Sequence, residues 1–509
     1  MAEPNMVETI EVCWVAAAVP DHDHHDLYDH HDLYDLSSTR TSVPKSLPLT
    51  FFDLRWSRLG IPLHLYFYEM SAPEDFFHTN IVPRLKHSLS LTLGHHFLPM
   101  AGTLTWPLGS PKPVLTYAPG DAVSLTVARS NADFSLLSDT DNVICDAPMC
   151  HPLVADLPAS RERLAVIAIQ LTVFPNCGFT IGITLNHVIL DAKSFVMFMK
   201  SWARICGSLG VGILDGVRDD LQSRICLPAD LEPFYDRGLI MDPANLEAVF
   251  SNHLLNSDGP QNRSLRPPLE RRLPPDSFQG TFQFPREKLE KFRRLLKVKI
   301  KNERQYGHPV HLSTFSLTCA YTWVCLVKAE GIKDSQVVLL FPVDCRSRLE
   351  PPLPQTYFGN CIATGYAVAE SELLLGKEGL FVAVKAISDA IKSINDGVLD
   401  GAKNWVSGSP VYNITTTSRL GGLYTTASSH HLGYYNTDFG WGKPKKMNLV
   451  FKYITGIICF SDRRNGDGGV EIGLILKKPH MEAFASLFVE GLNLIELALN
   501  SMSRIHLRL

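Results

Sequence analysis

The stretch that most constrains the fold is FTIGITLNHVILDAKSFVMFM, at residues 179–199. Its first half is a continuous apolar run, which is typical of a buried strand, and it leads directly into His187. Beyond Asp191 the apolar residues recur with helical spacing, as at Phe195 and Phe198. The stretch therefore predicts a strand, a short turn that carries His187 and Asp191, and an amphipathic helix.

Strands and helices are predicted to alternate through the rest of the chain as well. An extended run, LAVIAIQLTV, comes just before this stretch and is joined to it by the turn residues PNCG, so we expect a strand pair. Later segments predict two helices, a strand and a hairpin, in the order REKLEKFRRLLKVKI, STFSLTCAYTWVCLVKAEG, QVVLLFPVD and TGIICFS with GVEIGLIL. A long helix is expected from about Met481. This alternation favours an α/β fold with two layered domains.

The length of 509 residues and one long aperiodic segment indicate where the domains divide. The segment before residue 281 contains RSLRPPLERRLPPDS and few periodic runs, which is typical of a crossover between two halves. We therefore predict an N-terminal domain at residues 1–215, a linker at residues 216–280 and a C-terminal domain at residues 281–509.

Composition excludes several functions. The net charge is −4, which gives no reason to expect nucleic acid or an anionic membrane as a partner. No run approaches about 18 uncharged apolar residues, so no membrane span is expected. The eleven cysteines form no CxxC pair, and several lie in apolar runs, which indicates reduced thiols and a cytosolic protein. The repeated HHDLYD at 24–29 and 30–35 is expected to be a polar surface loop and not a metal site.

Several common catalytic motifs are missing from the sequence: no GxGxxG follows a strand, and GxxxxGK[ST], HExxH and GxSxG do not occur. What remains is the HxxxD spacing of His187 and Asp191. By itself this spacing is weak, because a lone histidine is often a hydrogen-bonded core residue. Two Gly-aromatic turns accompany it, YFGNC after DCRSRLEPPLP at 344–361 and DFGWGKP at 438–444. Such turns can simply hold loops on a core, but together with HxxxD they indicate a specific family.

On these residues the chain resembles the plant BAHD family of acyl-CoA-dependent acyltransferases, whose signatures are HxxxD and DFGWG. The resemblance continues through SLPLTFFDL, HFLPMAGTLTWP, LEPFYDRGLIMD and GGVEIGLILKKPHMEAFASLFVEGL. YFGNC with DCRSRL is similar to the branch that acylates sugars on anthocyanins and other flavonoid or phenolic glycosides. The resemblance implies two domains related to chloramphenicol acetyltransferase, each with a mixed β-sheet and flanking helices, and a channel between them. It also implies a monomer that uses acyl-CoA as co-substrate, with no permanently bound cofactor.

The reaction that the resemblance implies needs one base. A sugar hydroxyl is a poor nucleophile and a thioester is a reactive electrophile, so neutral His187 would accept the hydroxyl proton as the oxygen attacks, without an acyl-enzyme. The resemblance implies that Asp191 orients the loop through an ion pair and hydrogen bonds. It also implies a structural brace beside the CoA path, formed by Asp438, Phe439, Gly440, Trp441 and Gly442.

Upstream of DFGWG the chain departs from the family pattern. Many relatives carry a Thr-Ser-Trp stretch there, whereas this chain has ITTTSRL, with Thr417 at the tryptophan position. Thr416 is then the candidate donor to the reaction's oxyanion. The residues that follow, which include GLYTTASSHHLG, are interpreted as an insertion beside the cleft.

The sequence leaves the acyl donor open. A malonyl carboxylate favours an arginine fork, for which Arg346 and Arg348 are candidates, and Lys443 could approach the CoA phosphates. A hydroxycinnamoyl ring favours an aromatic pocket, for which Phe195 and Tyr357 are candidates. Malonyl is the preferred donor. Two alternatives remain: a BAHD enzyme that acylates another alcohol or an amine, and a non-catalytic homologue that binds CoA esters.

Overall fold

A computed structural model describes most of the chain. The described residues are 7–18, 43–57, 62–140, 144–160, 162–210, 225–256, 262–265, 273–302, 310–333, 335–407, 422–452 and 456–506. The histidine-rich repeat at 24–29 and 30–35, predicted to be a surface loop, lies outside them.

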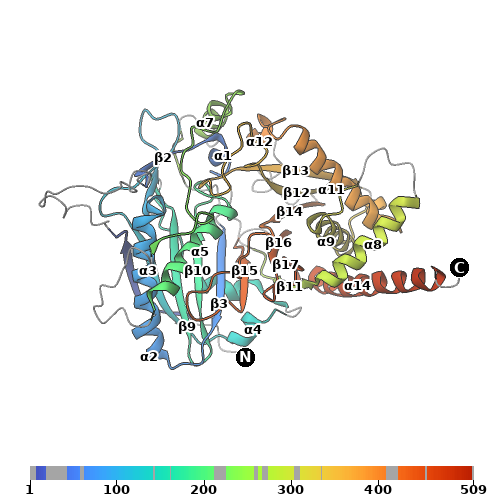
Figure 1. Cartoon of the computed structure of the whole chain (residues 1–509), viewed down its shortest axis with the longest axis horizontal. Helices are drawn as coiled ribbons and strands as arrows, with labels where there is room; N and C mark the ends of the chain where they lie inside the picture. The colour runs from blue at the N-terminus through green and yellow to red at the C-terminus, as the bar shows by residue number, and fades with distance from the viewer. Residues whose placement is uncertain are drawn as a thin grey trace, which may run out of the picture.

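The described residues form two neighbouring lobes, each built on a large β-sheet with helices packed against it (Figure 1). In the first lobe a six-stranded sheet has the order β1-β6-β9-β10-β3-β15. In that order its strands are Val7–Ala16, Ala122–Ser130, Ile167–Phe174, Gly178–Leu185, Leu63–Glu69 and Lys446–Val450. Strand β10 is buried along its whole length and pairs antiparallel with both β9 and β3.

Two long helices cover one face of this sheet, α3 (Val82–His95) and α5 (Ala192–Leu209) (Figure 1). Helix α5 buries an apolar stripe that includes Phe195, as its helical periodicity predicts. The indole N–H of Trp202 in α5 donates to the hydroxyl of Ser88 in α3 at 3.0 Å. The two helices are therefore held together by a buried hydrogen bond as well as by apolar packing.

The second lobe is built on a seven-stranded sheet with the order β13-β12-β14-β16-β17-β11-β7. In that order its strands are Ile362–Glu370, Gln336–Asp344, Leu423–Ala427, Ile457–Asp462, Val470–Lys477, Ser277–Phe284 and Ile144–Asp146. Four long helices pack beside it, α8 (Arg286–Asn302), α9 (Thr314–Glu330), α11 (Gly379–Asp396) and α14 (Lys478–His506) (Figure 1). Helix α9 is apolar around most of its circumference and is correspondingly buried.

The two lobes exchange strands. Strand β15, from the C-terminal part of the chain, lies at the edge of the first sheet, where Met447 pairs opposite Tyr66 of β3 (Figure 1). Conversely, β7 lies at the edge of the second sheet beside β11. The core of the first lobe also includes Phe439. The two large sheets and the core of the first lobe each contain residues from both halves of the chain. The division into residues 1–215 and 281–509 therefore stays a prediction.

The remaining elements are short. A four-stranded sheet has the order β2 (Ser46–Pro48), β5 (Val114–Thr116), β4 (Thr103–Thr105) and β8 (Arg163–Ala165). The other helical segments are α1 (Phe51–Leu54), α2 (Glu74–Phe76), η1 (Phe77–Ile81), η2 (Leu98–Ala101), α4 (Phe134–Ser138), η3 (Ala147–Leu153), α7 (Leu246–Asn256), α10 (Ser371–Leu375) and α12 (Asn404–Ser407). Among the described residues, none of the helices combines the length and the apolar character needed to cross a membrane.

The predicted α/β alternation is confirmed. The strand pair is β9 and β10, the predicted hairpin is β16 and β17, and the predicted helices correspond to α5, α8, α9 and α14. The interpretation of GLYTTASSHHLG as an insertion is wrong, because Leu423–Ala427 forms β14 inside the second sheet. The alternating burial of this strand, with Tyr424 at 1% exposure, explains why it belongs to the core.

Candidate active site

His187 lies at the end of the most buried part of the first sheet, in a turn of residues 186–191 that we call the His187 turn. The backbone N–H of Asn186 donates to the carbonyl of Val166 at 2.8 Å, which continues the pairing between β10 and its neighbour. The side-chain oxygen of Asn186 accepts from the N–H of Val188 at 3.1 Å and closes the turn. The strand and the turn thus fix the backbone of His187, whose side chain remains half-buried.

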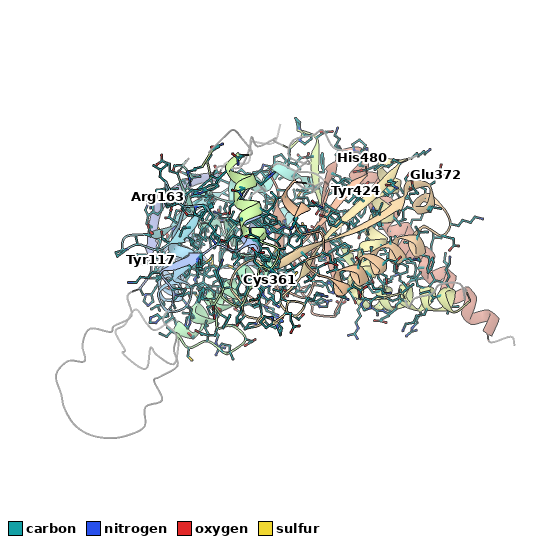
Figure 2. All side chains as sticks on the ribbon, turned by 90° about the horizontal axis from the view of Figure 1, so that it is seen from above. Tyr117, Arg163, Cys361, Glu372, Tyr424 and His480 are labelled. Carbon is teal, nitrogen blue, oxygen red and sulfur yellow. The ribbon has the colours of Figure 1, made fainter. Side chains whose placement is uncertain are left out.

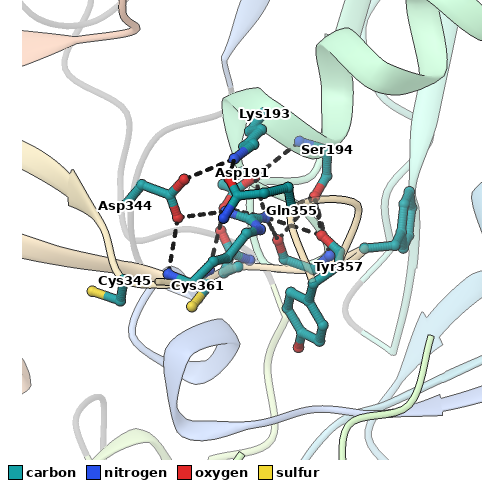
Figure 3. A network of polar contacts seen from close by, with 12 residues as sticks. Asp191, Lys193, Ser194, Asp344, Cys345, Gln355, Tyr357 and Cys361 are labelled. Carbon is teal, nitrogen blue, oxygen red and sulfur yellow. Dashed lines mark hydrogen bonds and ion pairs between the residues drawn. The ribbon is translucent and has the colours of Figure 1, made fainter. Parts of the chain in front are cut away.

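Asp191 begins helix α5, and its carboxylate is engaged by groups other than the His187 ring. It is the N-cap residue, and its carboxylate accepts from the backbone N–H of Ser194 at 2.9 Å. The same carboxylate forms an ion pair with Arg346 at 2.9 Å and accepts from the N–H of Cys361 at 3.2 Å. Figure 3 shows this network, in which Asp191 lies between α5 and the loop that carries Cys361. These contacts give Asp191 a place in holding the turn rather than in proton transfer.

Arg346 is enclosed in this network. Its side chain is 1% exposed, and its guanidinium donates to Asp191, to Asp344 and to the carbonyl of Tyr357. Burial favours the neutral form, but Asp191 and Asp344 outweigh it and raise the pKa of Arg346. Nη1 and Nη2 of Arg346 are both engaged by protein groups, and its contact with a donor carboxylate or CoA stays a prediction. Arg348 is exposed and donates to Asn395 at 2.9 Å.

The YFGNC loop (residues 357–361) reaches the His187 turn from the second half of the chain. The side-chain amide of Asn360 donates to the carbonyl of His187 at 2.9 Å and to that of Val188 at 3.2 Å. Cys361, at the end of this loop, lies where the two lobes meet (Figure 2). The loop thus supports the turn from the junction between the lobes.

A second buried ion pair supports Asn360 in turn. The Asn360 amide donates to Asp53 at 3.0 Å, and the other carboxylate oxygen of Asp53 pairs with Arg237. Asp53 is 0% and Arg237 4% exposed by side chain, and Asp53 raises the pKa of Arg237 against the effect of burial. Sequence reasoning missed Asn360, Asp53 and Arg237, although they lie in the quoted YFGNC, FFDL and FYDRG text. No local pattern there indicates that the three converge.

The ring of His187 is bounded on one face by Trp56, which stacks on it with a centroid separation of 3.9 Å and an interplanar angle of 7°. Nδ1 of His187 and the side-chain oxygen of Asn360 are both buried, and neither makes a hydrogen bond of normal geometry. Burial lowers the pKa of His187 below its ordinary value of 6.5 and Arg55 lowers it further, while the residue's own backbone carbonyl, Asp191 and Asn360 act in the opposite direction. The imidazole is thus neutral at pH 7 and can accept a proton.

The DFGWG turn (residues 438–442) lies at the other end of helix α5. The carboxylate of Asp438 accepts from the backbone N–H groups of Gly440 and Gly442 at 2.8 and 2.9 Å, so the turn closes on itself. Phe439 is fully buried and packs edge-on against Trp202. Because α5 rises about 1.5 Å per residue, this contact, eleven residues beyond Asp191, is roughly 16 Å along the helix from it.

Arg84 joins the DFGWG turn to the end of α5. Its guanidinium donates to the carbonyl of Cys206 at 2.6 and 2.8 Å, which satisfies one of the unpaired acceptors that every helix C-terminus has. The same group lies over the Trp441 ring at 4.7 Å. Gly440 has φ +101°, and a Cβ there would come within 2.5 Å of Arg84. The glycine is therefore required by both backbone and packing.

The other predicted site residues are less constrained. Lys443 is exposed and donates to Asn436 at 3.2 Å, so a contact with CoA phosphates stays a prediction. Thr416 lies outside the described residues, as does Thr417. Among the described residues no group of three or more His, Cys, Asp or Glu is placed to hold a metal ion.

A cavity lies where the lobes meet, between β15 and strands β11, β16 and β17. Its lining includes Asn448 of β15, Gln279 of β11 and Glu471 of β17. Burial raises the pKa of Glu471. His187 is not among the lining residues. The channel that would reach the base from both faces therefore stays a prediction.

The site thus presents a neutral imidazole near the junction of the two lobes, and a group of this kind can accept a proton from a substrate hydroxyl. The sequence matches the Transferase family over residues 37–211 and 242–490. It is 36% identical to phenolic glucoside malonyltransferase 1 of Arabidopsis thaliana, covering 90% of this chain and 95% of the relative. It is also 36% identical to the malonyl-CoA:anthocyanidin 5-O-glucoside-6''-O-malonyltransferase of the same plant. That alignment covers 90% of this chain and 98% of the relative.

Other relatives act on different substrates. Agmatine coumaroyltransferase of Arabidopsis thaliana is 35% identical, over 89% of this chain and 96% of the relative. The crystal structure of vinorine synthase has the same fold, with a TM-score of 0.60 over 94% of this chain and 96% of that one at 20% identity. The chain belongs to the Transferase family of BAHD acyl-CoA-dependent acyltransferases. The predicted family, branch and fold class are confirmed.

Proposed function

We propose that this chain transfers a malonyl group from malonyl-CoA to a sugar hydroxyl of an anthocyanin, flavonoid or other phenolic glucoside. The observation that carries the proposal is a neutral, half-buried His187 at the lobe junction of a chain that is 36% identical to two glucoside malonyltransferases. We infer the malonyl donor and the glucoside acceptor from the activities that those two relatives are named for. Agmatine coumaroyltransferase, at 35% identity, supplies the second candidate, a hydroxycinnamoyl donor with an amine acceptor.

His187 acts as the general base. Two candidate acceptors act on the ring, its own backbone carbonyl and the side chain of Asn360, and we assign the ring proton to the buried Nδ1, which leaves Nε2 as the acceptor. As the sugar oxygen attacks the thioester carbonyl, Nε2 takes the hydroxyl proton. The tetrahedral adduct then breaks its C–S bond, and the imidazolium returns the proton to the CoA thiolate. Asp191 and Asn360 hold the turn during these steps.

The DFGWG turn serves as a brace for the first lobe. Its contacts with Trp202 and Arg84 fix the far end of α5, the helix whose N-cap carries Asp191. A role beside the CoA path and a CoA contact by Lys443 are part of the same proposal. We also propose a cytosolic monomer, which light scattering at 56.7 kDa and the location of a fluorescent fusion would test.

Purified protein incubated with malonyl-CoA and a cyanidin glucoside should release free CoA thiol. Coumaroyl-CoA with the glucoside, and coumaroyl-CoA with agmatine, are parallel reactions that test the donor and the acceptor separately. Release only with agmatine would favour the second candidate. No release with any pair would support a non-catalytic homologue and contradict the proposal.

Replacement of the base is the sharpest test of mechanism. His187→Ala should lose about 10²- to 10⁴-fold in kcat, the usual contribution of a general base. The protein should fold normally, since Nδ1 of the imidazole makes no hydrogen bond of normal geometry that the substitution would break. His87→Ala, at an exposed position of α3, is the matched control and should keep full activity. An active His187→Ala enzyme would refute the base assignment.

A further inference from the structure

The indole ring of Trp56 lies parallel to the imidazole ring of His187 and in contact with it. Trp56 follows the short helix α1 and stacks on His187 at 3.9 Å and 7°. Random ring contacts seldom combine so short a separation with so small an angle, and neighbouring rings more often meet edge-on or offset. The indole covers one face of the imidazole, so substrate must approach the opposite face or the Nε2 edge.

The stack is held from the second lobe. Arg55 lies over the Trp56 ring at 5.2 Å and over the Trp405 ring at 4.4 Å. Its guanidinium donates to the carbonyl of Ile362 at 2.9 Å and to the hydroxyl of Thr364 at 2.7 Å, both in β13. The indole N–H of Trp56 is buried and has no acceptor. Ring contacts and packing against the core of the first lobe therefore hold the indole, without a side-chain hydrogen bond.

We propose that Trp56 is a positioning residue for the base: its stack fixes the plane of the His187 ring and stabilises the imidazolium that forms during acyl transfer. This inference rests on the proposed role of His187. In the resting enzyme the indole keeps water from one face of the neutral ring. Once the ring has accepted the hydroxyl proton, it is a cation against an aromatic face, which attracts positive charge. The interaction is thus stronger in the transition state than before it, which is what accelerates a reaction.

The charged and titratable groups that act on the imidazole are Arg55, next to the indole, His64 of β3 and Asp191 at the start of α5. None of the three covers the stacked face. Burial is the main cause of the lowered pKa of His187, and a stack that stabilises the imidazolium acts against it, so removal of Trp56 should lower this pKa further. The acid limb of the kcat/KM profile should then move to lower pH.

Kinetics of Trp56→Ala and Trp56→Phe test the proposal. Trp56→Ala should lower kcat by about 2- to 30-fold, the range that a cation–π contact supplies, with a smaller change in KM and a shifted acid limb. Trp56→Phe keeps a stacking ring and should restore most of kcat and the original limb. Trp14→Ala, at a tryptophan that is 61% exposed on β1, should behave like the parent enzyme. An unshifted limb in Trp56→Ala, or equal losses in the alanine and phenylalanine variants, would overturn the proposal.

A measurement without turnover separates this proposal from the proposed function. A protonated imidazole quenches the fluorescence of an indole stacked on it, so the emission of Trp56 should fall as His187 is protonated. The difference between the parent protein and Trp56→Phe isolates this signal. The transition should be present in the parent protein and disappear in His187→Gln. A pH titration with no such transition would contradict the stack, whereas a transition in a protein that releases no thiol would uphold the stack and contradict the function.

Discussion

Helix α5 has two very different ends, and each carries one of the two motifs that stand out in the sequence. At its start, Asp191 is 2% exposed and is bound by a buried arginine from the second half of the chain. At its end, Asp438 is exposed and bonds only to its own turn. Both motifs contain an aspartate and look equally prominent in the sequence. The structure gives the first a partner in another lobe and gives the second a local hydrogen-bonding role.

The difference teaches that burial and the distance to the partner decide what such an aspartate does. An exposed aspartate that caps its own turn contributes local geometry. A buried aspartate must have its charge compensated, and in doing so it joins segments 155 residues apart. The HxxxD end of α5 is thus where the two lobes are coupled, beside the base.

The largest difference between the two ends should appear when each aspartate is removed. Asp191→Ala leaves the buried Arg346 without its buried partner and with the partly exposed Asp344 as its counter-ion, which should cost up to about 3–5 kcal/mol of unfolding free energy. Asp438→Ala removes two hydrogen bonds at the surface and should cost much less. Urea denaturation of both variants measures the contrast. Equal losses at the two ends would break the comparison, and so would a normal stability for Asp191→Ala.

The sequence predicts the elements that lead into the site and one of its partners. Periodicity alone indicates β10, the His187 turn and α5, because each is set by a local pattern of burial. The HxxxD spacing, together with DFGWG, then singles out His187 and Asp191. The prediction was incomplete for Arg346, which DCRSRL makes conspicuous but whose burial against Asp191 no local pattern reveals.

The rest of the site depends on long-range pairing. Asn360 contacts the carbonyl of His187 across 173 residues, and β15 leaves its neighbours in sequence to pair with β3. Trp56 appears in the sequence as one more aromatic residue near FFDL. Such contacts are selected by the packing of whole lobes, and the local propensities of the segments are the same with or without them. The strand β14 was missed for a related reason, since a five-residue strand carries little periodic signal.

A smaller effect is expected from the two glycines of the DFGWG turn. Gly440 and Gly442 have φ of +101° and +95°, so alanine is strained at both, by about 1–3 kcal/mol. Only at Gly440 would the added methyl also meet Arg84, at 2.5 Å, whereas the space at Gly442 is open. Gly440→Ala should therefore be the less stable variant, while kcat per folded molecule stays within about two-fold for both. A loss of kcat in a folded Gly440→Ala enzyme would show that the brace reaches the base.

The smallest effect concerns the buried end of α5, where His64 lies against Phe195 with ring centroids 4.0 Å apart. Burial, and then His187, lower the pKa of His64 to about 3. The unfolded chain binds a proton at this residue near pH 6.5 and the folded protein does not, so the neutral histidine's contribution to stability is complete above pH 6.5 and is lost as the pH falls toward 3. Between pH 6.5 and 5 the slope from this residue approaches about 1.4 kcal/mol per pH unit. The free energy of unfolding of His64→Gln, measured by urea denaturation, should depend less steeply on pH than that of the parent protein.

The other end of α5 supplies the control. Among the described residues the DFGWG end buries no histidine of this kind, so Phe439→Leu should lower stability by a similar amount at every pH. A pH-dependent loss in Phe439→Leu would remove the contrast between the two ends.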